Sequence, residues 1–121
     1  MSELERRTGA ELGYILTTHK HWDHTDGNLE WVKERPDIQV FGSSLQPDEI
    51  PGLTHAMNDL ETMTIGEFCI SCMETPGHTQ DHCSFIVTHV AKESTKIPFL
   101  FCGDTLFSAG CGRIMDGCTA E

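Results

Sequence analysis

The chain has 121 residues, enough for one domain with a buried core. It carries 8 Lys and Arg against 19 Asp and Glu, a formal net charge of −11 at pH 7, which argues against nucleic acid or an anionic membrane as a partner. No apolar run approaches the roughly 20 residues of a membrane span, and the first seven residues lack the apolar stretch of a signal peptide. We therefore expect one domain, residues 1–121, in the cytoplasm; a longer form with a transit peptide would be mitochondrial.

The first half of the chain alternates between strand and helix signals. Runs of β-branched and aromatic residues favour strands, and Pro36 ends the one helical pattern. We predict a strand at residues 14–18 and a short helix at 26–35. A second strand is predicted at 38–41, and residues 43–59 are expected to be irregular.

The second half is predicted to be mostly strands. Residues 63–65 and 68–73 flank Gly66-Glu67 and are expected to pair as a hairpin. Two further strands, residues 84–87 and 98–101, are joined by a charged loop at 91–96. The whole pattern predicts an α/β or α+β domain with mixed sheets.

Six cysteines raise the question of a disulfide framework. The absence of a secretory signal and the strand-like surroundings of most of them argue against one. Cys69 and Cys72 have the spacing of a metal or redox pair, but residues three apart on a strand face opposite sides of the sheet. We therefore expect buried, reduced thiols.

Potential metal ligands gather directly after the first predicted strand, in Thr18-His19-Lys20-His21-Trp22-Asp23-His24. In extended chain His19 and His21 lie on one side, so both imidazoles can reach one ion. Asp23 and His24 follow where the chain turns toward the helix, and they point elsewhere. Four ligands in two directions are what a two-metal site needs.

Two more candidates follow later strands. Pro76-Gly77 predicts a turn that presents His78 at a strand end, with His82 expected to support the site through hydrogen bonds rather than as a ligand. Asp104 follows the apolar strand at 98–101, and its two oxygens could bridge two cations. The sequence therefore predicts a metal site at the edge of the sheets where these strands end.

These motifs, together with Gly103-Asp104-Thr105-Leu106-Phe107-Ser108-Ala109-Gly110-Cys111-Gly112-Arg113, resemble the metallo-β-lactamase superfamily and, within it, the glyoxalase II (hydroxyacylglutathione hydrolase) family, over about residues 14–121. The resemblance implies an αββα sandwich with two divalent ions at one rim, Zn first, with Fe or Mn as alternatives. By position, the first ion would be held by His19, His21 and His78. The second ion would be held by Asp23 and His24, and Asp104 would bridge the two ions.

The resemblance also implies a reaction. It is the hydrolysis of a small-molecule glutathione thioester, of the S-lactoylglutathione type, to a 2-hydroxy acid and glutathione, as in methylglyoxal detoxification. Asp23 and Asp104 would act as catalytic carboxylates, and Arg113 would bind a carboxylate of the substrate. No separate acid is needed, because a thiolate is a stable leaving group near neutral pH. The acyl group and the oligomeric state are left open.

The sequence departs from the family pattern. Family members have strands before the first histidine motif and a further metal-binding histidine later, whereas no His follows His89 here, and Met115 stands at an aromatic position. We therefore expect an internal or truncated piece with about one tightly bound metal, little or no turnover, and poor solubility unless another segment completes the sheets. Two alternatives compete with the hydrolase: a persulfide dioxygenase-like iron enzyme, and a catalytically impaired metal-binding remnant.

Overall fold

The computed structural model describes residues 3–90, 97–115, 117 and 118. The helices are α1 (Glu3–Thr8), α2 (Trp22–Thr25) and α3 (Asn28–Glu34), with two short 3₁₀ turns, η1 (Pro47–Glu49) and η2 (Gly103–Thr105). The strands are β1 (Tyr14–Leu16), β2 (Gln39–Ser43), β3 (His55–Met57), β4 (Thr62–Ile65), β5 (Phe68–Glu74), β6 (Cys83–His89) and β7 (Phe99–Phe101). Within the described ranges, no helix is long and apolar enough to cross a membrane.

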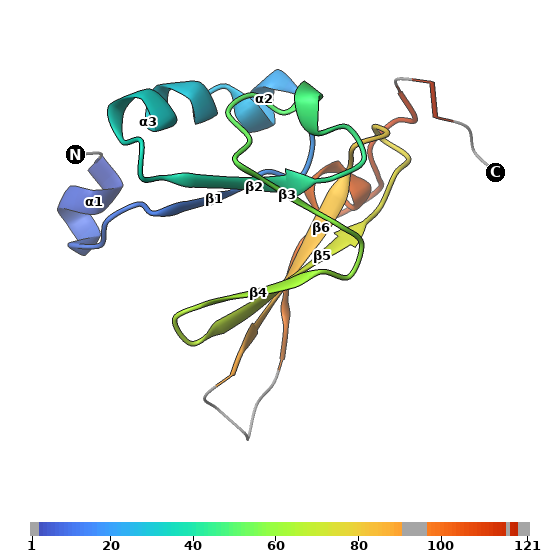
Figure 1. The fold of residues 1–121 in the computed structure, drawn as a ribbon. Coiled ribbons are helices and arrows are strands. Elements are labelled where there is room, and N and C mark those ends of the chain that lie inside the picture. Colours follow the sequence, from blue (N-terminus) through green and yellow to red (C-terminus); the bar gives the residue numbers. More distant parts are fainter. Residues whose placement is uncertain (1–2, 91–96, 116, 119–121) are drawn as a thin grey trace.

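The strands form two sheets of opposite character. The first is parallel, in the order β1-β2-β3, and the second is antiparallel, in the order β4-β5-β6-β7. Helices α2 and α3 lie over the outer face of the parallel sheet, and the antiparallel sheet crosses its other side (Figure 1). This arrangement is part of an αββα sandwich, so the predicted fold class is confirmed.

The hydrophobic core lies between the two sheets. Because side chains alternate along a strand, each sheet contributes every second residue to it. Its buried members come from four strands: Phe41, Met57, Ile70, Cys72, Cys83 and Phe85. Partly buried apolar residues pack around them: Leu16, Met63, Ile65 and Val87. Val40, next to Phe41, is also fully buried and faces the helix side.

Most predicted elements are present. The hairpin of β4 and β5 pairs Ile65 with Phe68, and Gly66 in its turn has φ +55°, which favours glycine. The predicted helix at 26–35 is α3, preceded by the separate short helix α2. The predicted charged loop at 91–96 lies outside the described residues.

The expectation of an irregular stretch at 43–59 is wrong in part. Residues 55–57 form β3, which pairs in parallel with the end of β2 from Phe41 to Ser43. His-Ala-Met has no β-branched residue and is too short to carry a pattern of its own. Residues 55–57 are a strand because they form main-chain hydrogen bonds with the edge of β2.

The expectation of buried thiols is confirmed for two of the six cysteines and wrong for the exposed Cys111. All six are free thiols, and Cys72 and Cys83 are fully buried in the core. Cys69 pairs with Thr88 on the opposite face of the sheet and is half-buried, so Cys69 and Cys72 do not share a face. Cys111, by contrast, is exposed.

Candidate metal centre

Three segments that follow strands meet at one end of the sandwich. They are the loop after β1, the loop between β5 and β6, and the turn η2 after β7. Main-chain hydrogen bonds join them: the Cys83 N–H donates to the Thr18 carbonyl at 2.8 Å, and the Met115 N–H donates to the His78 carbonyl at 3.1 Å. Residues far apart in the sequence are thereby brought to one rim.

The first loop is held by buried polar contacts rather than by apolar packing. The Asn28 side-chain amide donates to Thr17 Oγ1 at 3.0 Å and to the Pro51 carbonyl at 3.1 Å. Thr25 Oγ1 donates to the His21 carbonyl at 3.1 Å. Thr17, Thr25 and Asn28 are all buried, so these bonds fix how the loop leaves β1. The sequence predicted none of these contacts.

The first cluster of ligand atoms, the triple-histidine group, consists of His19, His21 and His78. His21 Nδ1 lies 3.2 Å from His19 Nε2 and 2.9 Å from His78 Nε2. Nitrogen ligands of a tetrahedral zinc ion lie about 3.3 Å from one another, since each is about 2.0–2.1 Å from the metal. The three side chains therefore fit one metal ion.

The second cluster, the aspartate group, consists of His19, His24 and Asp104. One carboxylate oxygen of Asp104 lies 3.2 Å from His24 Nε2, and the other lies 3.3 Å from His78 Nε2. The two oxygens of Asp104 thus face histidines of the two different groups. This is the geometry of a bridging carboxylate.

The two other predicted site residues are placed less centrally. Asp23 is exposed on α2, with one carboxylate oxygen 3.6 Å from His24 Nε2, and it belongs to neither group. Arg113 is also exposed, but its main-chain carbonyl accepts a hydrogen bond from His78 Nδ1 at 2.7 Å. A carbonyl only accepts, so Nδ1 carries the proton and the Nε2 lone pair of His78 faces the site. No sequence signal could have indicated this main-chain contact.

Burial keeps two of the imidazoles neutral. Burial lowers the pKa of His19 to about 3, with smaller effects from His24, His82, His21 and His78. Burial and the neighbouring His78 lower the pKa of His82 to about 4 against the opposing carboxylates of Asp81 and Asp104. Neutral imidazole is the form that binds metal, so the buried His19 is suited to be a ligand in both groups.

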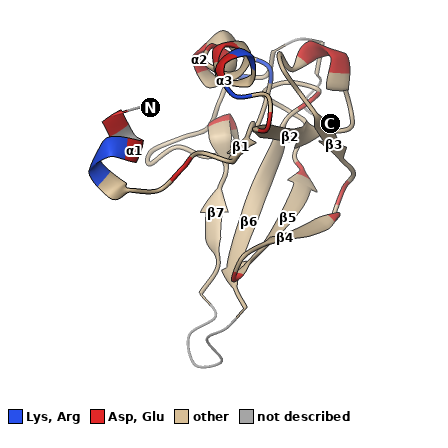
Figure 2. Cartoon of the chain, turned by 60° about the vertical axis from the view of Figure 1, so that its left-hand side comes forward, with Lys and Arg blue, Asp and Glu red and all other residues tan. Residues whose placement is uncertain are grey.

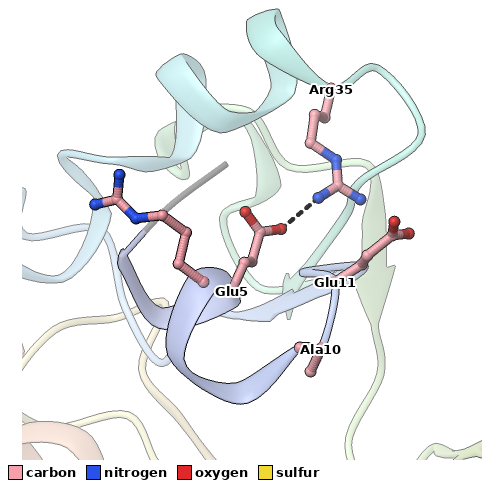
Figure 3. A pocket seen from close by; sticks show the side chains of 6 residues that line it. Glu5, Ala10, Glu11 and Arg35 are labelled. Atoms are coloured by element: carbon pink, nitrogen blue, oxygen red, sulfur yellow. Dashed lines mark hydrogen bonds and ion pairs between the residues drawn. The ribbon is translucent and has the colours of Figure 1, made fainter.

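Two hollows in the surface differ in their relation to this centre. One of about 250 Å³ adjoins it, lined in part by His78, Asp104, Cys111 and Ile114. Another, of about 550 Å³, lies at the amino-terminal end of β1 beside α1, where Glu5 pairs with Arg35 (Figure 3). His19 and His21 follow the opposite end of β1, so of these two hollows the first is the one that can hold a molecule against the ligand atoms.

Comparisons with known proteins agree with the fold and the motifs. The family model described as the metallo-beta-lactamase superfamily matches residues 2–119. The cytoplasmic hydroxyacylglutathione hydrolase of Arabidopsis thaliana is 42% identical over 93% of this chain and 42% of its own length. A probable hydroxyacylglutathione hydrolase of Schizosaccharomyces pombe is 43% identical over 92% of this chain and 40% of its own length. The chain thus spans about two fifths of the curated relatives it matches.

Solved structures share the fold at lower sequence identity. A metallo-beta-lactamase from Staphylococcus aureus superposes with a TM-score of 0.76 at 24% identity, over 93% of this chain and 33% of that one. A class B3 di-zinc metallo-beta-lactamase from an Alaskan soil metagenome gives a TM-score of 0.67 at 19% identity, over 79% of this chain and 44% of that one. At these identities the likeness concerns the fold alone.

Proposed function

The chain belongs to the metallo-beta-lactamase superfamily, and from this premise we propose that it is a metal-dependent hydrolase of small glutathione thioesters of the S-lactoylglutathione type. Two relatives, 42% and 43% identical, carry the name hydroxyacylglutathione hydrolase. The structural observation that carries the proposal is the convergence of five side chains on two ligand groups: His19, His21, His24, His78 and Asp104. Since one of the two relatives is named cytoplasmic, we place this reaction in the cytoplasm.

We assign the triple-histidine group to one divalent ion and the aspartate group, with the neighbouring Asp23, to a second. Zinc suits these imidazole and carboxylate ligands, with Fe or Mn as alternatives. When bound, such a metal pair supplies water ionised near neutral pH and polarises the thioester carbonyl. Because His19 belongs to both groups, the aspartate group has only His24, Asp104 and the exposed Asp23 as ligands of its own. We therefore expect one ion to be held more tightly than the other.

The protein side chains orient the reaction. The proton on His78 Nδ1 is committed to the Arg113 carbonyl, so this imidazole keeps a fixed tautomer and direction. Asp104 is held between His24 and His78, and Asp23 lies beside His24, where its carboxylate can accept a hydrogen bond from the attacking water. The exposed Arg113 guanidinium can pair with a carboxylate of glutathione near the hollow that adjoins the centre.

The test combines metal analysis with turnover. The protein is loaded with zinc, its metal content is measured by mass spectrometry, and hydrolysis of S-lactoylglutathione is followed before and after treatment with a chelator. We expect slow hydrolysis that the chelator abolishes and about one tightly bound ion per chain. Bound metal without hydrolysis would identify a metal-binding remnant. Iron-dependent oxygen consumption with glutathione persulfide would instead identify a dioxygenase.

A second substrate isolates the role of Arg113. A lactoyl thioester of a small thiol without carboxylates offers the same reacting bond but nothing for the guanidinium to bind. We expect Arg113→Gln to raise KM for the glutathione thioester and to leave turnover of the truncated thioester unchanged. Equal effects on both substrates would show that Arg113 does not bind a carboxylate of the substrate.

A further inference from the structure

We propose that His82 is a positioning residue that fixes the main chain at Asp104 and thereby aims the carboxylate lying between the two ligand groups. The imidazole belongs to neither group, although it is fully buried beside them. The inference rests on the proposed function in one respect only, because it takes Asp104 to be a metal ligand. The contacts on which it is built are independent of that role.

Both nitrogens of His82 are committed to hydrogen bonds. The Asp104 N–H donates to His82 Nε2 at 3.1 Å. A backbone amide can only donate, so Nε2 presents its lone pair and, in the neutral ring, the proton is on Nδ1. His82 Nδ1 lies 2.9 Å from Thr75 Oγ1 and 3.2 Å from Thr105 Oγ1. The ring therefore has no nitrogen left for a metal.

These contacts tie the turn η2 to the ends of β5 and β6. Thr105 Oγ1 donates to Thr75 Oγ1 at 3.2 Å, and Thr75 Oγ1 lies 3.2 Å from Ser84 Oγ. The turn is thus held at two adjacent residues, through the main chain of Asp104 and through the side chain of Thr105. It is anchored to the same segment that presents His78.

Packing leaves the ring and the turn little room to move. The His82 ring stacks on the His19 ring, with centroids 4.8 Å apart and an interplanar angle of 21°. Gly103 has φ +49°, and a Cβ at that position would lie 2.8 Å from His82 Nε2 and 2.6 Å from Thr18 Oγ1. The backbone of η2 therefore rests directly on the imidazole, which requires glycine at this position.

The consequence for the centre follows from distances. The carboxylate of Asp104 reaches His24 and His78 at 3.2 and 3.3 Å only while its own main chain is held in place. Without an acceptor at the position of Nε2, the Asp104 amide would be left unpaired and the turn would shift. Loss of comparable supporting hydrogen bonds costs about 10–100-fold in metal affinity.

Two matched variants separate the hydrogen bond from the bulk of the ring. Gln places its amide oxygen close to where Nε2 stands, whereas Asn reaches only the Nδ1 position, so His82→Gln keeps an acceptor for Asp104 and His82→Asn does not. We expect zinc affinity, measured against a competing chelator, to fall about 10–100-fold in His82→Asn. We expect His82→Gln to recover most of that loss. Equal losses in both variants, or none in either, would overturn the proposal.

A measurement on the metal-free wild type tests the contact itself. Nitrogen NMR of His82 should give the pattern of a protonated Nδ1 and an unprotonated Nε2, and the Asp104 amide should exchange slowly with solvent. We expect that exchange to quicken in His82→Asn but not in His82→Gln. A fast-exchanging Asp104 amide in the folded wild type would refute the positioning role. If the wild type binds no zinc while these amide results hold, the proposed function fails and the contact stands.

Discussion

Two regions of the molecule, the rim that carries the histidines and the edge strand β7, invert the usual distribution of polar and apolar side chains. At the rim that carries the histidines, His19, Asp81 and His82 are fully buried. At the edge strand β7, Phe99 and Phe101 are 63% and 55% exposed. The strands of this sheet carry no Lys or Arg, and they are almost entirely free of charge in Figure 2. Buried polar groups need partners, so the rim depends on hydrogen bonds, whereas we expect the exposed side chains of the edge strand to contribute little to stability.

Not every buried polar atom at the rim has a partner. Within the part of the chain that the structure describes, the hydroxyl of Thr79 and both carboxylate oxygens of Asp81 are buried without a hydrogen bond, in contrast to the fully bonded His82 in the same loop. Burying an unpaired polar group costs free energy.

The largest expected effect compares two phenylalanines that are direct partners on neighbouring strands. Phe85 on β6 pairs with Phe101 on β7, yet Phe85 is fully buried and Phe101 is half-exposed. We expect Phe85→Ala to lower the free energy of unfolding by about 3–5 kcal/mol. Phe101→Ala should lower it by about 1 kcal/mol or less, since little apolar surface is lost from the core. Chemical denaturation measures both, and similar losses would mean that β7 is as well packed as β6.

The next effect concerns the rim. His78→Ala removes a ligand from the triple-histidine group, and we expect zinc affinity to fall by more than about 100-fold, beyond the loss from a supporting residue. His55→Ala is the matched control, because His55 is exposed on β3 and lies in neither group. Competition with a chelator gives both affinities. If both variants retained wild-type affinity, the triple-histidine group would not be the metal site.

A smaller effect is expected from the glycine that supports Asp104. A Cβ at Gly112 would lie 2.4 Å from the Asp104 carbonyl oxygen and 2.7 Å from His78 Nδ1. In Gly112→Ala both atoms must therefore move away from residue 112. Such overpacking typically costs about 1–3 kcal/mol of unfolding free energy. Gly110→Ala is the control, because nothing lies within 4 Å of its Cβ position. The melting temperature of Gly112→Ala should be lower than that of Gly110→Ala. Equal melting temperatures would show that the rim accommodates the added methyl group without loss of stability.

The smallest effect is expected on the outer face of β7. Leu100 is half-exposed and alternates with Phe99 and Phe101, so Leu100→Lys should change the unfolding free energy by less than about 0.5 kcal/mol. A charge on an edge strand opposes pairing between molecules, so less protein should aggregate at high concentration. Light scattering measures this. Unchanged aggregation would mean that the apolar edge is not the surface through which molecules associate.

Much of the fold could be predicted because its signals are local. The hairpin of β4 and β5 follows from its turn, and the ends of β1, β5 and β7 follow from apolar runs that stop at Gly, Pro or polar residues. The strand β3 could not be predicted, because a three-residue strand without β-branched residues depends on its partner β2 for its hydrogen bonds. Likewise, no local pattern marks Asn28 as the residue that joins Thr17 to Pro51.

The sequence by itself determined which residues can bind metal and that they follow strands, because residue type and the period of two along a strand are local properties. Only the tertiary structure decided how they combine. It placed His19 in both ligand groups, left Asp23 outside them, and joined the Arg113 carbonyl to His78 and the Asp104 amide to His82. Those pairings link segments that are 22 or more residues apart, and their distances depend on how the two sheets pack.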